Sequence, residues 1–157
     1  MKTILKLFVI AFIAVSCGGG GDTADASSEA PGKVKMPATF EEAEANWKDY
    51  QGVGPIKPFA LPGTIDQDMA AKGQEVFESL CTTCHKADKK YIGPAPKGIF
   101  DRRNPAWVMN MILNPEEMVQ KDPLAKLLLM EYNGSPMANQ NLSEEDARAV
   151  LEYFRTL

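Results

Sequence analysis

The sequence predicts an all-α domain that follows an N-terminal signal-like stretch and a flexible linker. Amphipathic segments begin and end the region 66–157, and three Asx-Pro pairs of the kind that start helices lie between them. No segment alternates apolar and polar residues with the period of two that a half-buried strand shows. The 157 residues allow one domain with appendages, and the net charge of −4 without long basic runs argues against nucleic acid as a partner.

Residues 1–17 have the features of an export signal. Lys2 and Lys6 flank the start of an apolar run over 4–15, which is too short for a bilayer span of about 20 residues. Small residues then lead to Cys17, so the stretch resembles a bacterial lipoprotein signal, in which this cysteine carries the lipid. An ordinary signal peptide or an uncleaved anchor is the alternative. We expect an exported protein, held by lipid to a membrane on the periplasmic or cell-envelope side.

Two segments separate the signal from the main domain. Residues 18–38 are rich in glycine, serine and small acids and are predicted to form a flexible linker. Residues 39–65 form an N-terminal extension: a short helix over 39–50, followed by a proline-rich strap that we expect to run extended over the surface. The apolar side of the helix either packs on its own domain or binds a partner.

The main domain is predicted over 66–157, with a helix at each end. The first runs from a cap at Asp66 or Asp68 to about Leu80, and the last begins at Ser143. Gly73 lies inside the first helix, where it costs about 1 kcal/mol relative to alanine. We therefore expect a close crossing there, with an aromatic side chain of the last helix packed into the notch.

The three Asx-Pro pairs predict the helices between these two. Each pair places a capping side chain before a proline at the first helical position. The expected helices cover 105–113, 115–120 and 123–132, and Asn133-Gly134 ends the last.

The motif Cys81-Thr82-Thr83-Cys84-His85 is the attachment pattern of a c-type haem, so one covalent haem is the predicted cofactor. Both thiols fall on one side of a tight turn, and the imidazole follows directly. A zinc site needs four ligands, whereas this motif uses the chain's one histidine and every cysteine except Cys17. A thioredoxin-like dithiol expects a βαβ context, and no strand pattern flanks the motif.

The second axial ligand of the iron is predicted to be a methionine. His85 is the only histidine, so the chain alone cannot supply two. Met137 follows Gly134-Ser135-Pro136 in a loop, 52 residues beyond His85, and is the preferred candidate. Met130 and Met111 are the alternatives, and an open sixth position is the remaining one.

Residues 66–157 resemble a class I, monohaem cytochrome c. The resemblance rests on the haem motif, Gly93-Pro94, Trp107, Ser135-Pro136-Met137 and the final Leu-Glu-Tyr-Phe helix. It implies a cytochrome c-like fold of short helices around the haem, with His85 as proximal ligand and a methionine opposite. It also implies that the Pro94 carbonyl holds the other ring nitrogen of His85 and that Trp107 donates its indole N–H to a haem propionate.

Taken together, these features favour a single-electron carrier rather than an enzyme. No other catalytic constellation is present, and His/Met ligation leaves no position for a small-molecule substrate. The expected partners are redox proteins or respiratory complexes at the membrane; the alternatives are a fixed monohaem subunit of one such complex and, more distantly, a gas sensor. The stretch 86–103 is locally basic: its lysines either steer an acidic partner or are solvated, and Arg102 and Arg103 are candidates to neutralise propionates.

Overall fold

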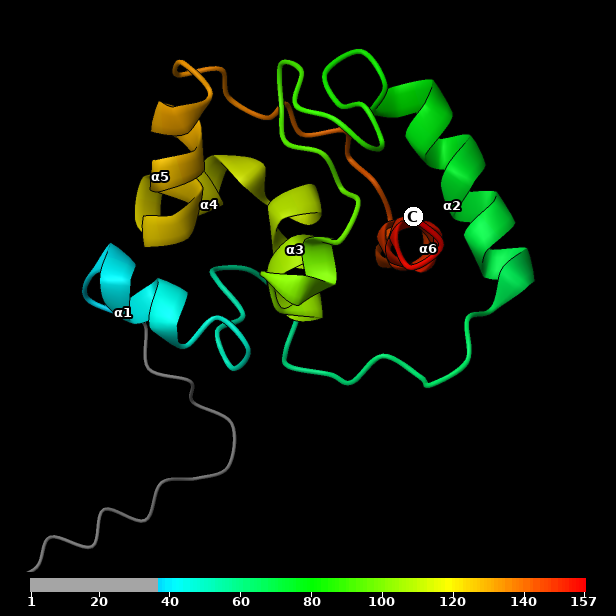
Figure 1. Cartoon of the computed structure of the whole chain (residues 1–157), viewed down its shortest axis with the longest axis horizontal. Helices are drawn as coiled ribbons and strands as arrows, with labels where there is room; N and C mark the ends of the chain where they lie inside the picture. Colours follow the sequence, from blue (N-terminus) through cyan, green and yellow to red (C-terminus); the bar gives the residue numbers. More distant parts are fainter. Residues whose placement is uncertain (1–36) are drawn as a thin grey trace, which may run out of the picture.

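The computed structural model describes residues 37–157. Over that range the chain forms six α-helices, one short 3-10 helix and no strand, which confirms the all-α prediction (Figure 1). None of the helices in this range is long and apolar enough to cross a membrane. The predicted signal with Cys17, and the linker up to residue 36, lie outside the described residues.

Helix α1, Phe40–Ala45, is shorter than the predicted 39–50. The side chain of Thr39 caps its start by accepting from the N–H of Glu42. Its end falls at Asn46, whose side chain donates to the Glu42 carbonyl at 2.9 Å, because asparagine competes with the backbone for helical hydrogen bonds. The turn that follows brings Tyr50 into the core, where the residue is 3% exposed. As one of the two alternatives anticipated, α1 packs on its own domain, beside α5 (Figure 1).

Residues 51–65, called the strap here, connect α1 to α2 along one edge of the molecule (Figure 1). The expectation that the strap lies over the surface is wrong for its first half. Ile56 is buried, and its N–H and C=O both bond to the side chain of Asn110, which is fully buried. Gly52, at φ +73°, fits against Trp107 and Met118, which a Cβ would approach to 2.8 Å. The first half of the strap is therefore packed into the domain.

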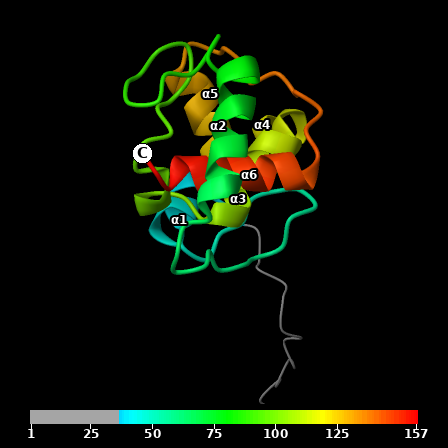
Figure 2. The ribbon, with the colours of Figure 1, turned by 90° about the vertical axis from the view of Figure 1, so that its right-hand side faces the viewer.

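Helices α2, Gln67–Leu80, and α6, Glu144–Phe154, cross each other steeply (Figure 2). Their predicted caps are present: Asp66 accepts from the N–H of Met69, and Ser143 accepts from that of Asp146. Gly73 marks the crossing as expected, but the partner differs. A Cβ at Gly73 would collide with the Ala149 carbonyl, so a helix backbone fills the notch.

The aromatic side chains of α6 pack one turn further along α2. The rings of Tyr153 and Phe154 lie with their centroids 5.5 and 5.7 Å from that of Phe77. These contacts join the first and last helices of the predicted haem domain through ring packing.

The central helices are α3, Pro105–Leu113, α4, Pro115–Lys121, and α5, Pro123–Glu131. All three begin at the predicted prolines, and Asn104 and Asp122 cap their helices. Asn114 does not cap α4; its amide donates to Glu117 instead. A 3-10 helix, Ile99–Asp101, was not predicted and follows Gly98 at φ +65°.

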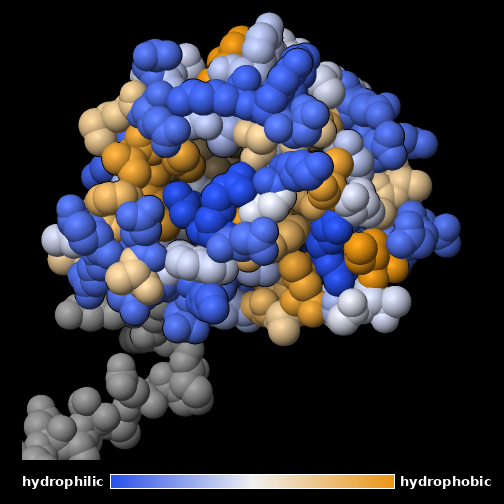
Figure 3. Space-filling view, in the orientation of Figure 1, coloured by the Kyte–Doolittle hydropathy of each residue, from blue (hydrophilic) through white to orange (hydrophobic). Residues whose placement is uncertain are grey.

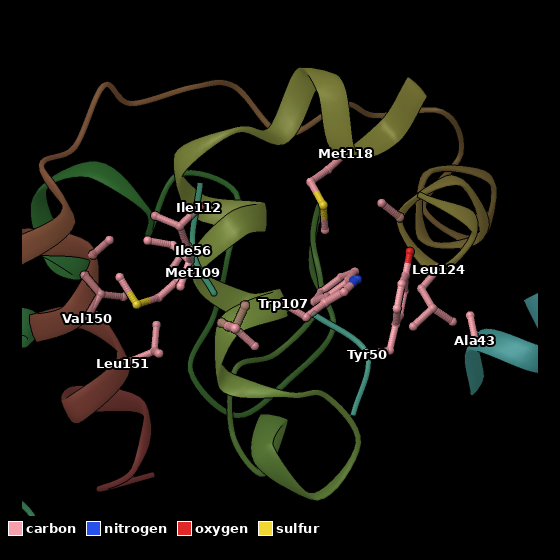
Figure 4. Close-up of a cluster of buried hydrophobic side chains, with 14 residues drawn as sticks. Ala43, Tyr50, Ile56, Trp107, Met109, Ile112, Met118, Leu124, Val150 and Leu151 are labelled. Carbon is pink, nitrogen blue, oxygen red and sulfur yellow. The ribbon is translucent and has the colours of Figure 1, made fainter. Parts of the chain in front are cut away.

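Helix α3 lies at the centre of the core. Most of its residues are buried, and it contacts the strap on one side and α6 on another. Figure 4 shows Met109 and Ile112 near Val150 and Leu151 of α6, whereas Trp107 lies beside Tyr50 with Met118 and Leu124 around them. The central helix thus joins both halves of the domain and forms part of the cavity described next.

Candidate functional site

The motif Cys81–His85 forms one turn that continues the backbone path of α2. The N–H of Cys81 donates to the Phe77 carbonyl, and the N–H groups of Cys84 and His85 then both donate to the Cys81 carbonyl, at 3.1 and 2.8 Å. This turn places both thiols and the imidazole on the wall of one cavity. Burial, and secondly the neighbouring Cys84, raise the pKa of the Cys81 thiol to about 11, so the unreacted group is protonated at neutral pH.

The loop after the motif orients the imidazole. Nδ1 of His85 lies 2.8 Å from the carbonyl oxygen of Pro94, which is the contact that the family resemblance implied. A carbonyl oxygen can only accept, so in the neutral imidazole Nδ1 is the protonated nitrogen and Nε2 is the one with the lone pair. Gly93 lies against the ring, and a Cβ there would come within 2.5 Å of Cε1 of His85. The loop therefore presents Nε2 in the form that binds a metal.

The methionines considered as the second axial ligand differ in whether they line the cavity. Met137 and Met111 contribute to its lining, whereas Met130 is 69% exposed and does not. The Sδ atom of Met118 accepts a hydrogen bond from Val53, and Met109 belongs to the core. Of the two methionines on the cavity wall, Met137 lies in a loop and Met111 in α3.

Trp107 lines the cavity, but its indole nitrogen has a different partner from the one expected. Nε1 donates to Oδ1 of Asp122 at 3.2 Å, so it is not directed at a propionate. Asp122 is fully buried and also accepts from the N–H of Ala125 and the hydroxyl of Tyr50. The physical reason is that a buried carboxylate is costly unless its oxygens find donors, and the indole N–H is one of them. Burial, followed by the hydrogen bond to Asp122, raises the pKa of Tyr50, which keeps this hydroxyl a donor.

The two arginines considered as propionate partners have different roles in the structure. Arg102 braces the loop by donating to the carbonyls of Ala95, Lys97 and Gly98 at 2.7–3.1 Å. Arg103 is 9% exposed, lines the cavity and lies over the Trp107 ring at 5.4 Å. No carboxylate among residues 37–157 forms an ion pair with it. Burial, and then the charge of Arg102, lower the pKa of Arg103, so an anion in the cavity would relieve a real cost.

The remaining cavity wall is mostly apolar and drawn from every part of the domain. It includes side chains of α2, α3, α4, α5 and α6, of the connection between α2 and α3, and of the loop between α5 and α6. Among them are Phe77, Ile99, Val108, Ile112, Val119, Leu128, Leu129, Pro136, Leu142, Val150 and Phe154. An apolar chamber with two thiols, one metal-binding nitrogen, two thioethers and two guanidinium groups fits a haem with its carboxylates. The described part of the chain contains no cluster of three or more His, Cys, Asp or Glu side chains that could bind a metal ion directly.

Basic and aromatic side chains surround one edge of the cavity. Ile92 and Tyr132 line it, and Ile92 is 44% exposed beside Tyr91 at 53%. The ammonium group of Lys86 lies 4.9 Å from the Tyr91 ring, and that of Lys90 lies 4.2 Å from the Tyr132 ring. Figure 3 shows how hydrophobic patches lie among mostly hydrophilic side chains on one face of the molecule. Two of the four lysines in the locally basic stretch 86–103 therefore have aromatic partners.

The region that holds the cavity matches one family. The profile of the family described as cytochrome c matches residues 70–157. Among solved structures, a cytochrome c from Rhodothermus marinus is 45% identical with a TM-score of 0.62, over 66% of this chain and 88% of that one. An engineered form of the same protein is 44% identical with a TM-score of 0.62, over 66% and 89% of the two chains.

Curated relatives match over a shorter stretch. A cytochrome c2 from Rhodopseudomonas palustris is 53% identical over 34 residues, which is 22% of this chain. The match spans 29% of the length of that relative. A second cytochrome c2 from the same organism gives the same identity over the same length.

Proposed function

Because the chain belongs to the cytochrome c family, with that family's covalent c-type haem, we propose that it carries single electrons with His85 and Met137 as the axial ligands. The observation that carries the proposal is the single cavity, which has the Nε2 lone pair of His85 on one wall and the Met137 side chain in its lining. The haem supplies one reversible electron between ferrous and ferric iron.

In this proposal each residue of the site has a separate role. Cys81 and Cys84 form the thioether bonds, and His85 is kept in one tautomer by the Pro94 carbonyl. Met137 provides a thioether, which favours the ferrous state and raises the potential relative to a second histidine. With both axial positions filled by the chain, no position is left for a small-molecule substrate, and the protein is a carrier rather than an enzyme.

Arg103 is proposed to neutralise a haem propionate. Both arginines line the cavity, but Arg102 is engaged with three loop carbonyls. The buried guanidinium of Arg103 has no carboxylate partner among the described residues and donates to one carbonyl, that of Arg102. Trp107 is proposed to act as a wall against the haem, since its N–H is already bonded to Asp122.

The partners proposed are membrane-associated respiratory proteins on the exported side of a bacterial membrane. Support comes from the signal-like residues 1–17 and from the basic and aromatic side chains at the edge of the cavity, which suit an acidic partner. We propose Cys17 as the lipid attachment site. Cys17→Ser is expected to move the haem protein from the membrane fraction to the soluble fraction, and an unchanged distribution would contradict lipid anchoring.

The arrangement of residues 39–65 favours the mobile carrier over a fixed subunit. A fixed subunit would use this extension as its assembly surface. Its apolar residues are instead committed to the domain itself: Ala43, Tyr50 and Ile56 are at most 8% exposed. The apolar contacts that an assembly surface would need are therefore already used.

A redox titration of the purified haem-loaded chain tests the proposed function. Spectra recorded at a series of applied potentials are expected to follow a one-electron curve, reversible in both directions, and the ferrous protein is expected not to bind added carbon monoxide. Free binding of carbon monoxide to the wild-type ferrous protein would mean that the sixth position is open, and the carrier would be replaced by a ligand-binding haem protein.

A further inference from the structure

Asp122 is a fully buried acid whose carboxylate has three donors and no cation. The N–H of Ala125 lies 2.8 Å and Nε1 of Trp107 lies 3.2 Å from Oδ1, and the hydroxyl of Tyr50 bonds to Oδ2. No lysine or arginine among residues 37–157 forms an ion pair with it. All three partners donate, so both carboxyl oxygens act as acceptors.

Two of these three donors belong to the wall of the haem cavity. Trp107 and Ala125 both contribute to the lining and both donate to the carboxylate of Asp122, which is not itself part of the lining. The charge of Asp122 is therefore one side-chain layer behind the cavity, in a part of the core where water does not screen it.

The third donor comes from outside the haem-binding helices. Tyr50 lies 72 residues before Asp122, between α1 and the strap, and is 3% exposed. Figure 4 shows its ring beside that of Trp107. This hydroxyl connects the N-terminal extension to the cavity wall through a single shared carboxylate.

We propose that Asp122 is a positioning residue that lowers the reduction potential of the haem, and that Tyr50 moderates its effect. A buried negative charge without an ion-pair partner stabilises ferric over ferrous haem because the ferric form carries one more positive charge. The Asp122 charge also acts on the Arg103 guanidinium, but the two groups form no ion pair. The hydrogen bond from the Tyr50 hydroxyl disperses part of the charge of Asp122. It therefore raises the reduction potential of the haem toward the value expected if the acid were absent. This inference rests on the proposed electron-carrier function.

Glu152 provides a matched control because it is also a buried acid. It is 1% exposed, but Arg148 and Arg155 form ion pairs with it at 2.5 and 2.6 Å. It also holds the strap, since Arg155 donates to the carbonyls of Pro62 and Thr64. Glu152 does not line the cavity. Removing its charge therefore tests the cost of losing a buried acid without the predicted effect on the haem.

The experiment compares midpoint potentials of the haem-loaded wild type, Asp122→Asn, Tyr50→Phe and Glu152→Gln, together with their unfolding by denaturant. Asp122→Asn is expected to raise the potential, Tyr50→Phe to lower it, and Glu152→Gln to leave it within error of the wild type. The unfolding free energy is expected to fall in all three variants. Stability alone therefore does not distinguish an electrostatic effect on the haem from a general loss of packing. A potential for Asp122→Asn at or below that of Glu152→Gln would overturn the inference, and so would a rise in Tyr50→Phe.

Two checks keep the inference separate from the proposed function. The ferric spectrum of each variant is expected to keep the weak near-red band of sulfur-to-iron ligation. If Asp122→Asn loses that band, the sign of the shift in Tyr50→Phe, which keeps the carboxylate, decides the inference. Failure of the proposed function shows in the wild type itself, as an open sixth position, whereas failure of this inference leaves the wild-type spectrum and its one-electron curve unchanged.

Discussion

His85 is oriented by two neighbours in the loop that follows it. The Pro94 carbonyl accepts from Nδ1, and Gly93 lies close enough to the ring to exclude any side chain. The same glycine donates its N–H to the Cys84 carbonyl at 2.8 Å, which ties the loop back to the haem motif. The Pro94 carbonyl therefore selects the tautomer of His85, and the absence of a side chain at Gly93 leaves room for the ring.

Gly93→Ala is predicted to disturb the imidazole directly. Its Cβ would lie 2.5 Å from Cε1 and 2.9 Å from Nδ1 of His85, so the ring must shift away from the Pro94 carbonyl. Overpacking of this kind costs about 1–3 kcal/mol in unfolding free energy. Denaturant unfolding of the haem-loaded variant measures the loss, and its visible spectrum reports the altered ligation.

Gly63→Ala is the control for this change. It adds the same methyl group where no atom lies within 4 Å and where φ is not positive. Its effect is expected to stay within about 0.5 kcal/mol. Equal stability of the two variants would contradict the tight packing of Gly93 on His85.

Among the elements, the crossing of α2 and α6 holds the two ends of the domain together. The backbones meet at Gly73, the rings of Tyr153 and Phe154 pack on Phe77, and Lys72 bridges to Glu145 and Asp146. The lysine bridges are exposed and contribute little, so the close backbone approach and the ring contacts carry the crossing.

Gly73→Ala is predicted to push these helices apart. The new Cβ would overlap the Ala149 carbonyl, and a backbone atom cannot move aside as a flexible side chain does. The loss in unfolding free energy is expected at about 3 kcal/mol or more, the upper end for overpacked sites. Denaturant unfolding measures it, and a loss comparable to that of Gly63→Ala would refute the account of this crossing.

The strap depends on one side chain of α3. Asn110 accepts from the N–H of Ile56 and donates to the carbonyls of Ile56 and Gln51 at 2.9–3.1 Å; the two bonds to Ile56 are buried and the one to Gln51 is partly buried. It is the neutral counterpart of Asp122, since both hold the N-terminal extension against the central helices.

Asn110→Ala is predicted to release the strap. It leaves three backbone groups without partners, and each buried unsatisfied group costs about 1–3 kcal/mol. The change is expected to lower the unfolding free energy by several kcal/mol and to expose the strap to proteolysis. Asn139→Ala, which removes an exposed hydrogen bond to Asn141, is the control and is expected to have little effect. Resistance of the strap to protease in both variants would argue against this anchoring role.

In the whole molecule, the N-terminal extension and the haem-binding helices share one core. Tyr50 and Ile56 are separated from their partners Asp122 and Asn110 by 72 and 54 residues. Such contacts follow from the tertiary arrangement of helices, and local patterns of proline or apolar spacing do not encode them. This is why the sequence suggested a strap over the surface.

The parts predicted well were those that depend on local chemistry. The spacing of Cys81, Cys84 and His85 and the prolines after Asx residues determine a turn and three helix starts within a few residues. The contact between Pro94 and His85 was available only through resemblance to a family, because nothing local links a carbonyl to a histidine nine residues earlier.

The features that sequence analysis missed are the hydrogen-bond partners of buried polar side chains, for which several groups compete. Asp122 has the sequence of an ordinary helix cap, and it does cap α5. Its burial adds a demand for further donors, which takes the indole N–H of Trp107 away from the expected propionate. Arg102 and Arg103 both line the cavity, and their different roles follow from their partners: the Arg102 guanidinium donates to three loop carbonyls, whereas that of Arg103 lies over the Trp107 ring. A buried acid of this kind leaves no distinct mark in a sequence.

The central claim is that one cavity holds a haem between His85 and Met137, and the near-red absorption band of the ferric protein tests it most directly. The measurement compares the wild type with Met137→Ala and with Met111→Ala, which truncates the other methionine on the cavity wall. The account predicts the band in the wild type and in Met111→Ala and its loss in Met137→Ala. A band that persists in Met137→Ala, or that disappears only in Met111→Ala, would contradict the assignment of the second ligand.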